Sequence, residues 1–231
     1  MNMGNSNYKI GKPAFNKLLI KAIIPCYLWF GLKKLKVTVK EIAGKLPDKS
    51  GILIAPHHED DADPFVIKKA TKRRLNWIAA TKFRSRSIFE YKLLRSITDM
   101  LGIISIDPKN PERNKGLFDY VTYLLKIGEA VVIFPEGNLR NERNNKRLGK
   151  AKDGVIRIAQ FAQKKLRKKI QIYPIGLEYK KKDNVTEAYM RTGIPFYVSS
   201  KENPKKAMLK LIKEIAILSN IKNETHTFFK R

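Results

Sequence analysis

Short apolar runs alternate with longer amphipathic segments along most of this chain, and this alternation limits the folds open to it. Helical patterns lie at 87–100, at 111–127 and from about 150 to 168, and a further helix start is expected at Asp63-Pro64. A last strand at 194–199 and a C-terminal helix after Asn203-Pro204 complete the order. Strands alternating with helices predict an α/β domain with a mixed, largely parallel sheet flanked by helices. The buried-strand candidates are GILIAP (51–56), NWIAAT (76–81), IISID (103–107), AVVIFPEG (130–137) and IQIYPIGLEY (170–179).

The size and composition of the chain fit one such domain. It has 231 residues, of which 43% are hydrophobic, enough for a sizeable core. The lone cysteine, Cys26, allows no internal disulfide and indicates a reducing compartment. A zinc site built on cysteine pairs is excluded, because the chain has no such pair.

The N-terminal segment has the pattern of a helix that lies on a membrane. In AFNKLLIKAIIPCYLWFGLKKLK the uncharged run, residues 22–32, is too short to span a bilayer, which takes roughly 20 apolar residues. Lys17 and Lys21 share one helical face, and aromatic residues precede a second basic cluster. We therefore expect residues 1–46 to form an amphipathic, helical membrane anchor and residues 47–231 to form the α/β domain. An ordinary helix that covers the core is the alternative.

The formal net charge of +27 is typical of a protein that binds nucleic acid, an anionic membrane surface or phosphorylated substrates; compositional drift in a chain rich in Lys, Ile and Asn is the alternative explanation. A nucleic-acid binder would combine basic residues with exposed aromatic side chains or a recognition helix. Here the aromatic residues lie mostly inside apolar runs. The sequence therefore favours an anionic membrane surface, with the protein associated with the cytoplasmic face, and predicts no nucleic-acid partner.

The stretch APHHEDDADPF, residues 55–65, follows the first predicted strand and contains two of the three histidines. A histidine that acts as a general base is usually oriented by a carboxylate on its far ring nitrogen. His58 and Asp63 have four residues between them, enough for a turn to bring them together, whereas Ala62 holds the equivalent place for His57. The spacing predicts His58 as the base and Asp63 as its orienting acid, with Asp63 also a candidate helix cap.

The same stretch raises the alternative of a metal site, because histidine and carboxylate side chains are common metal ligands. The third histidine, His226, lies in the C-terminal tail, and a site built from a single loop would lack ligands from facing strands. We therefore predict no metal, and we expect Glu59, Asp60 and Asp61 to be solvated residues of the turn.

Several motifs together resemble the glycerophospholipid acyltransferases of the 1-acylglycerol-3-phosphate acyltransferase family. HHEDDADPF is similar to the HX4D motif of that family, and FPEG (134–137) matches its third motif. GIISIDP (102–108) and IYPIGL (172–177) are similar to its second and fourth motifs, in the same order. KAKDGVIRIA, with Lys152 and Gly154, resembles the start of a helix in the family.

This resemblance implies transfer of a fatty acyl group from a thioester to a hydroxyl of a lysophospholipid. His58 would take the proton of the acceptor hydroxyl, and Asp63 would steer its ring. Glu136 and Gly137 would help to form the acceptor site. The co-substrate would be acyl-CoA or an acyl carrier protein, with no bound cofactor. The acceptor expected first is 1-acyl-glycerol-3-phosphate; another lysolipid, glycerol-3-phosphate and hydrolysis of a lipid ester remain open.

The chain departs from the family where phosphate is bound. Pro108 stands where the family usually has arginine, with Lys109 next, and after FPEG the arginine is displaced by one position to Arg140. Lysine presents a point charge and not a planar fork. Lys109, Arg140 and Lys152 are therefore the candidates for binding the acceptor phosphate. The sequence leaves acyl-chain length and oligomeric state open.

Overall fold

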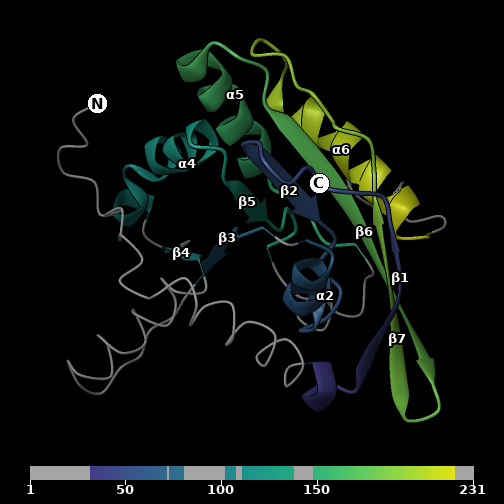
Figure 1. The fold of residues 1–231 in the computed structure, drawn as a ribbon. Helices are drawn as coiled ribbons and strands as arrows, with labels where there is room; N and C mark the ends of the chain where they lie inside the picture. Colours follow the sequence, from purple (N-terminus) through teal and green to yellow (C-terminus); the bar gives the residue numbers. More distant parts are fainter. Residues whose placement is uncertain (1–31, 72, 81–101, 108–110, 138–147, 222–231) are drawn as a thin grey trace, which may run out of the picture.

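The sheet of this protein has seven strands in the part of the chain that the computed structural model describes, residues 32–71, 73–80, 102–107, 111–137 and 148–221. The strands are β1 (Val37–Ala43), β2 (Ile52–Pro56), β3 (Leu75–Ala80), β4 (Ile103–Ile106), β5 (Ala130–Ile133), β6 (Gln171–Lys182) and β7 (Val185–Thr192). Their order is β1-β7-β6-β2-β5-β3-β4. β6 and β7 pair antiparallel, and the other neighbours pair in parallel. The predicted mixed, largely parallel sheet is confirmed (Figure 1).

Helices cover both faces of this sheet, which explains why its central strands are apolar throughout (Figure 1). Along β2, Leu53 and Ala55 pack into the core beneath three of the helices, while Ile52 and Ile54 pack into the core on the opposite face. All five residues of β2 are buried. The three helices on the first face are α4 (Leu117–Lys126), α5 (Gly154–Leu166) and α6 (Pro204–Leu218), and α2 (Asp63–Lys69) lies on the other.

The described helices follow the sequence with one interruption. The predicted helix at 111–127 is divided into a short 3-10 helix, η1 (Pro111–Asn114), and α4. Gly116 precedes α4 with a φ of 84°, a left-handed conformation that glycine adopts without steric cost. The expected start of α6 is confirmed, because the Asn203 side chain accepts hydrogen bonds from the backbone of Lys205 and Lys206. The helix predicted at 87–100 lies outside the described residues.

The sheet contains two strands, β1 and β7, that were not among the predicted strands. The strand expected at 194–199 is wrong: Phe196 forms only an isolated bridge to Ile172. The strand that follows β6 is β7, and Asp183, at a φ of 54°, lies in the turn that joins them. β1 pairs with β7, so residues 37–43 are a strand of the sheet and not part of an N-terminal helix. Residues 1–31 of the expected membrane anchor lie outside the described residues.

Gly176 provides a test of how tightly β6 packs against the end of α6. A Cβ atom at this position would lie 2.2 Å from the carbonyl carbon of Leu218, too close for the backbone to accept. We expect Gly176→Ala to lower the free energy of unfolding by about 1–3 kcal/mol, the usual cost of overpacking. Gly154→Ala is the matched control, because a Cβ atom added there would meet nothing within 4 Å. Urea unfolding should separate the two variants, and equal stabilities would contradict this packing.

Candidate active site

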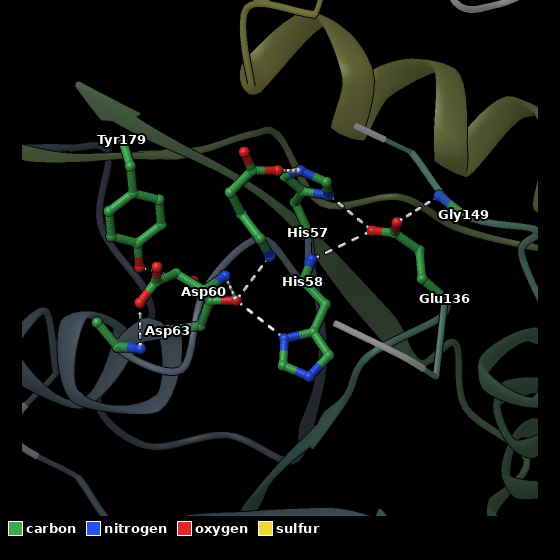
Figure 2. Close-up of polar contacts among 9 residues, drawn as sticks. His57, His58, Asp60, Asp63, Glu136, Gly149 and Tyr179 are labelled. Atoms are coloured by element: carbon green, nitrogen blue, oxygen red, sulfur yellow. Dashed lines mark hydrogen bonds and ion pairs between the residues drawn. The ribbon is translucent and has the colours of Figure 1, made fainter. Parts of the chain in front are cut away.

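The candidate site lies where two neighbouring parallel strands end. β2 leads directly into His57 and His58, and β5 leads into the FPEG turn that contains Glu136. The register of Ile54 opposite Val132 brings the carboxyl ends of these strands to the same edge of the sheet. Such an edge is where α/β sheets usually form their sites. The two motifs meet there, because the backbone N–H of His58 donates to Oε1 of Glu136 at 3.1 Å (Figure 2).

The predicted base and its orienting acid are in hydrogen-bond contact. Nδ1 of His58 lies 2.9 Å from Oδ2 of Asp63. The Asp63 side chain is fully buried, whereas the His58 side chain is 18% exposed. An inaccessible carboxylate therefore holds an imidazole that is partly exposed to solvent. This arrangement is suited to general base catalysis through Nε2, the other ring nitrogen.

The Asp63 carboxylate also holds the turn that carries His58. Its Oδ2 accepts hydrogen bonds from the backbone N–H groups of Glu59, at 2.8 Å, and Asp60, at 3.2 Å. Its Oδ1 accepts from the Tyr179 hydroxyl at 2.6 Å. Asp63 is the first residue of α2, and Ala62 is the cap, so the expectation that Asp63 caps the helix is wrong. Its carboxylate bends back over the preceding turn (Figure 2).

Two opposing effects act on the ionisation of Asp63. The pKa of Asp63 is raised, because burial deprives the charged form of water, and the hydrogen bonds from His58, Tyr179 and Asp60, which lower it, offset only part of this effect. All of its contacts in Figure 2 are with groups that can donate, which favours the carboxylate form. An ionised Asp63 fixes the proton of His58 on Nδ1 and leaves Nε2 as the basic nitrogen.

An aromatic side chain from the FPEG turn fixes the plane of the His58 ring. Phe134 stacks on it with the ring centroids 4.0 Å apart and the planes at 25°. Trp77 of β3 lies on a near-parallel plane, 6.2 Å from Phe134. The hydrogen bond to Asp63 and the stacking on Phe134 together restrict rotation of the imidazole. The predicted base is thus held in one orientation by the protein itself.

His57 is the residue for which sequence reasoning failed most clearly. It was expected to lack a carboxylate partner, but its Nδ1 lies 2.6 Å from Oε1 of Glu136 and its Nε2 lies 2.8 Å from Oε2 of Glu59. The His57 side chain is 1% exposed and the Glu59 side chain 7% exposed, so the expectation of a solvated Glu59 is also wrong. His57 therefore joins the HX4D turn to the FPEG turn, and neither ring nitrogen faces solvent.

Of the residues predicted to bind the acceptor, Glu136, Gly137 and Lys152 lie within the described part of the chain. Glu136 is buried, and its second oxygen accepts from the backbone of Gly149 at 2.6 Å. Gly137 has a φ of 72°, and a Cβ there would lie 2.9 Å from Nζ of Lys152. Lys152 thus lies against the FPEG turn, and because it is also exposed, an anion could approach it there. Lys109 and Arg140 lie outside the described residues.

Tyr179 is a residue of the site that sequence reasoning missed. It comes from β6, far from both motifs in the sequence, and its contact with Asp63 depends on the strand order. The signal in the sequence was the strand period of two, which places Tyr173, Ile175, Leu177 and Tyr179 on the face that α2 covers.

Neither a metal centre nor a membrane span is found within the residues that the structure describes. There, no three His, Cys, Asp or Glu side chains are grouped to hold a metal ion. No described helix is both long enough and apolar enough to cross a bilayer.

Comparison with known proteins assigns the family. Residues 36–178, more than half of the chain, match the model of the family described as Acyltransferase. The chain belongs to this acyltransferase family. The resemblance inferred from the motifs is thereby confirmed.

The proteins similar to this chain include a curated relative and a solved structure. A probable 1-acyl-sn-glycerol-3-phosphate acyltransferase of Mycoplasma genitalium is 26% identical over 137 residues, which are 58% of this chain and 48% of that protein. The match thus spans about half of that relative. The crystal structure of PlsC, the 1-acyl-sn-glycerophosphate (LPA) acyltransferase of Thermotoga maritima, matches with a TM-score of 0.58 and 12% identity, covering 91% of this chain and 85% of that chain. At this identity the match shows a shared fold.

The buried contact between His57 and Glu59 should contribute to the stability of the fold. We expect Glu59→Ala to lower the free energy of unfolding by about 1–3 kcal/mol, because it removes a partner of a buried ring nitrogen. Asp61→Ala is the matched control in the same turn, where the side chain is exposed, and should change stability by less than about 0.5 kcal/mol. Denaturant unfolding measures both, and a cost at Asp61 equal to that at Glu59 would contradict the role of this contact.

Proposed function

We propose that this protein transfers a fatty acyl group from an acyl thioester to a hydroxyl of a lysophospholipid, with 1-acyl-glycerol-3-phosphate as the preferred acceptor. One observation carries the proposal: a partly exposed His58, held by a buried Asp63, at the carboxyl end of β2 in a chain of the acyltransferase family. The names of the two similar proteins support the same acceptor.

The proposed reaction is a direct transfer without an acyl-enzyme. Nε2 of His58 accepts the proton of the acceptor hydroxyl as its oxygen attacks the thioester carbonyl carbon. The C–S bond of the resulting tetrahedral intermediate then breaks, and the protonated ring returns the proton to the leaving thiolate. The products are the new oxygen ester and the free thiol of the donor, and His58 is neutral again. Asp63 accepts the hydrogen bond from Nδ1–H throughout and does not take the proton.

The substrates and the place of reaction are proposed from charge and chemistry. The donor is acyl-CoA or an acyl carrier protein, both of which offer a thioester. A net charge of +27 and the aromatic and basic N-terminal segment favour an anionic membrane surface, on the cytoplasmic face, as the source of the acceptor. The protein itself supplies the base and its orienting acid, so the proposed reaction uses no bound cofactor.

The test is acyl transfer from labelled acyl-CoA and acyl carrier protein to a panel of lysolipids in anionic vesicles. His58→Ala and Asp63→Asn should each lower kcat/KM by about 10²–10⁴-fold, because they remove the base or its orientation. Asp61→Asn is the control for charge in the turn and should leave turnover unchanged. Unaltered transfer by His58→Ala would reject the mechanism. Release of free fatty acid at the same rate without lysolipid would identify a hydrolase instead.

Lys152 gives a prediction for the acceptor phosphate. Because its ammonium lies against the FPEG turn, we expect Lys152→Met to raise the KM for 1-acyl-glycerol-3-phosphate about tenfold, as for loss of one charge-assisted contact. Lys150→Met, which removes an exposed neighbouring charge, is the control and should have little effect. Equal effects of the two substitutions would show a general effect of charge and not a phosphate contact.

A further inference from the structure

The contact between Tyr179 and Asp63 links the proposed catalytic pair to a strand that contains neither the HX4D motif nor FPEG. The Tyr179 hydroxyl donates to Oδ1 of Asp63 at 2.6 Å, while Oδ2 faces His58 and the turn (Figure 2). Tyr179 lies in β6, and the residues that match the family model end at 178. The contact is therefore a feature of this chain that its motifs do not reveal.

The chemistry of Tyr179 restricts it to a single role toward Asp63. Its ring packs against the core on the face that α2 covers. Burial and the neighbouring Asp63 charge raise the pKa of Tyr179 well above its usual range, so the phenol keeps its proton. A phenol that stays protonated beside a carboxylate oxygen can only donate. Tyr179 is thus a permanent donor to the acid that orients His58.

We propose that Tyr179 is a positioning residue of the site, which holds Asp63 in the orientation and the charge state that His58 needs to act as a base. This inference rests on the function proposed above. The phenol occupies Oδ1 and so reserves Oδ2 for His58 and for the backbone of the turn. It also withdraws charge from the carboxylate, which keeps the shared proton on the imidazole and not on Asp63.

Removal of the phenol hydroxyl should change the pH dependence in one direction. The hydrogen bond from Tyr179 lowers the pKa of Asp63, so its loss makes the carboxylate a stronger base. A more basic Asp63 binds the Nδ1 proton more strongly, which in turn makes Nε2 of His58 more basic. The higher basicity of Asp63 and that of His58 Nε2 both mean that the two side chains together take up a proton at higher pH. The acidic limb of the kcat/KM profile should therefore shift upward.

The other charged groups near Tyr179 are the same in wild type and in Tyr179→Phe, so they do not account for a shift between the two proteins. Glu59 and Asp60 in the turn act on Tyr179 with the same sign as Asp63, because each raises its pKa. Helix α2 carries its basic last-turn residues, Lys68 and Lys69, at the opposite end from Asp63. The residue of β7 opposite Tyr179 is the apolar Ala188.

The experiment compares Tyr179→Phe with Tyr189→Phe in the full chain. Tyr189 is the matched control, because its hydroxyl also donates to a carboxylate, that of Glu187 at 2.8 Å, in the neighbouring strand β7. We expect Tyr179→Phe to lower kcat about tenfold, to leave KM within about twofold and to shift the acidic limb to higher pH. Tyr189→Phe should retain the wild-type profile. An unshifted profile in Tyr179→Phe, or an equal shift in both variants, would overturn the inference.

A measurement without turnover separates failure of this inference from failure of the proposed function. NMR of protein labelled with ¹⁵N-histidine follows the protonation of His58 against pH, with His58→Gln used for assignment. The His58 transition should lie at higher pH in Tyr179→Phe than in the wild type and Tyr189→Phe. If the wild type shows no acyl transfer but this shift occurs, the proposed reaction fails while the role of Tyr179 stands. If transfer occurs without the shift, the role of Tyr179 is refuted.

Discussion

The buried carboxylate of Asp63 is the interaction on which the rest of the site depends. A charge removed from water is costly unless donors surround it. Here the donors come from the imidazole of His58, from two backbone N–H groups of the turn and from Tyr179 of β6. The same contacts that make the buried charge tolerable also orient the His58 ring, shape the turn and join it to the sheet. The contacts of Asp63 therefore serve two purposes at once: they stabilise this edge of the sheet and they orient the His58 ring.

A second buried acid, Glu136, joins the turn that follows β2 to the turn that follows β5. Glu136 bonds to the backbone of His58, to the ring of His57 and to Gly149, so its side chain is directed into the protein interior. This does not favour Glu136 as a group that meets substrate directly. Its position suits it to hold the HX4D turn against the FPEG turn. Its expected contribution to the acceptor site would then act through the backbone that it anchors.

Prediction from sequence succeeded where local pattern determines structure and failed where partners are distant. The central strands are apolar because both faces of the sheet are covered, so β2 and β5 were recognisable. β1 and β7 were missed because their half-exposed residues carry a mixed pattern. The pair of His58 and Asp63 follows from a spacing within one turn. The partners of His57 and the contact of Tyr179 require the strand order, which no local window contains.

The two adjacent histidines point to opposite sides of the chain, and this gives one a structural role and leaves the other for chemistry. Successive side chains leave the end of an extended strand on opposite sides. His57 points into the protein, where both of its nitrogens meet carboxylates within 2.8 Å, so it has no nitrogen left for a substrate proton. His58 points the other way, commits Nδ1 to Asp63 and stacks on Phe134. Of the two histidines, His58 is therefore the one whose ring is placed to act as a base at this edge.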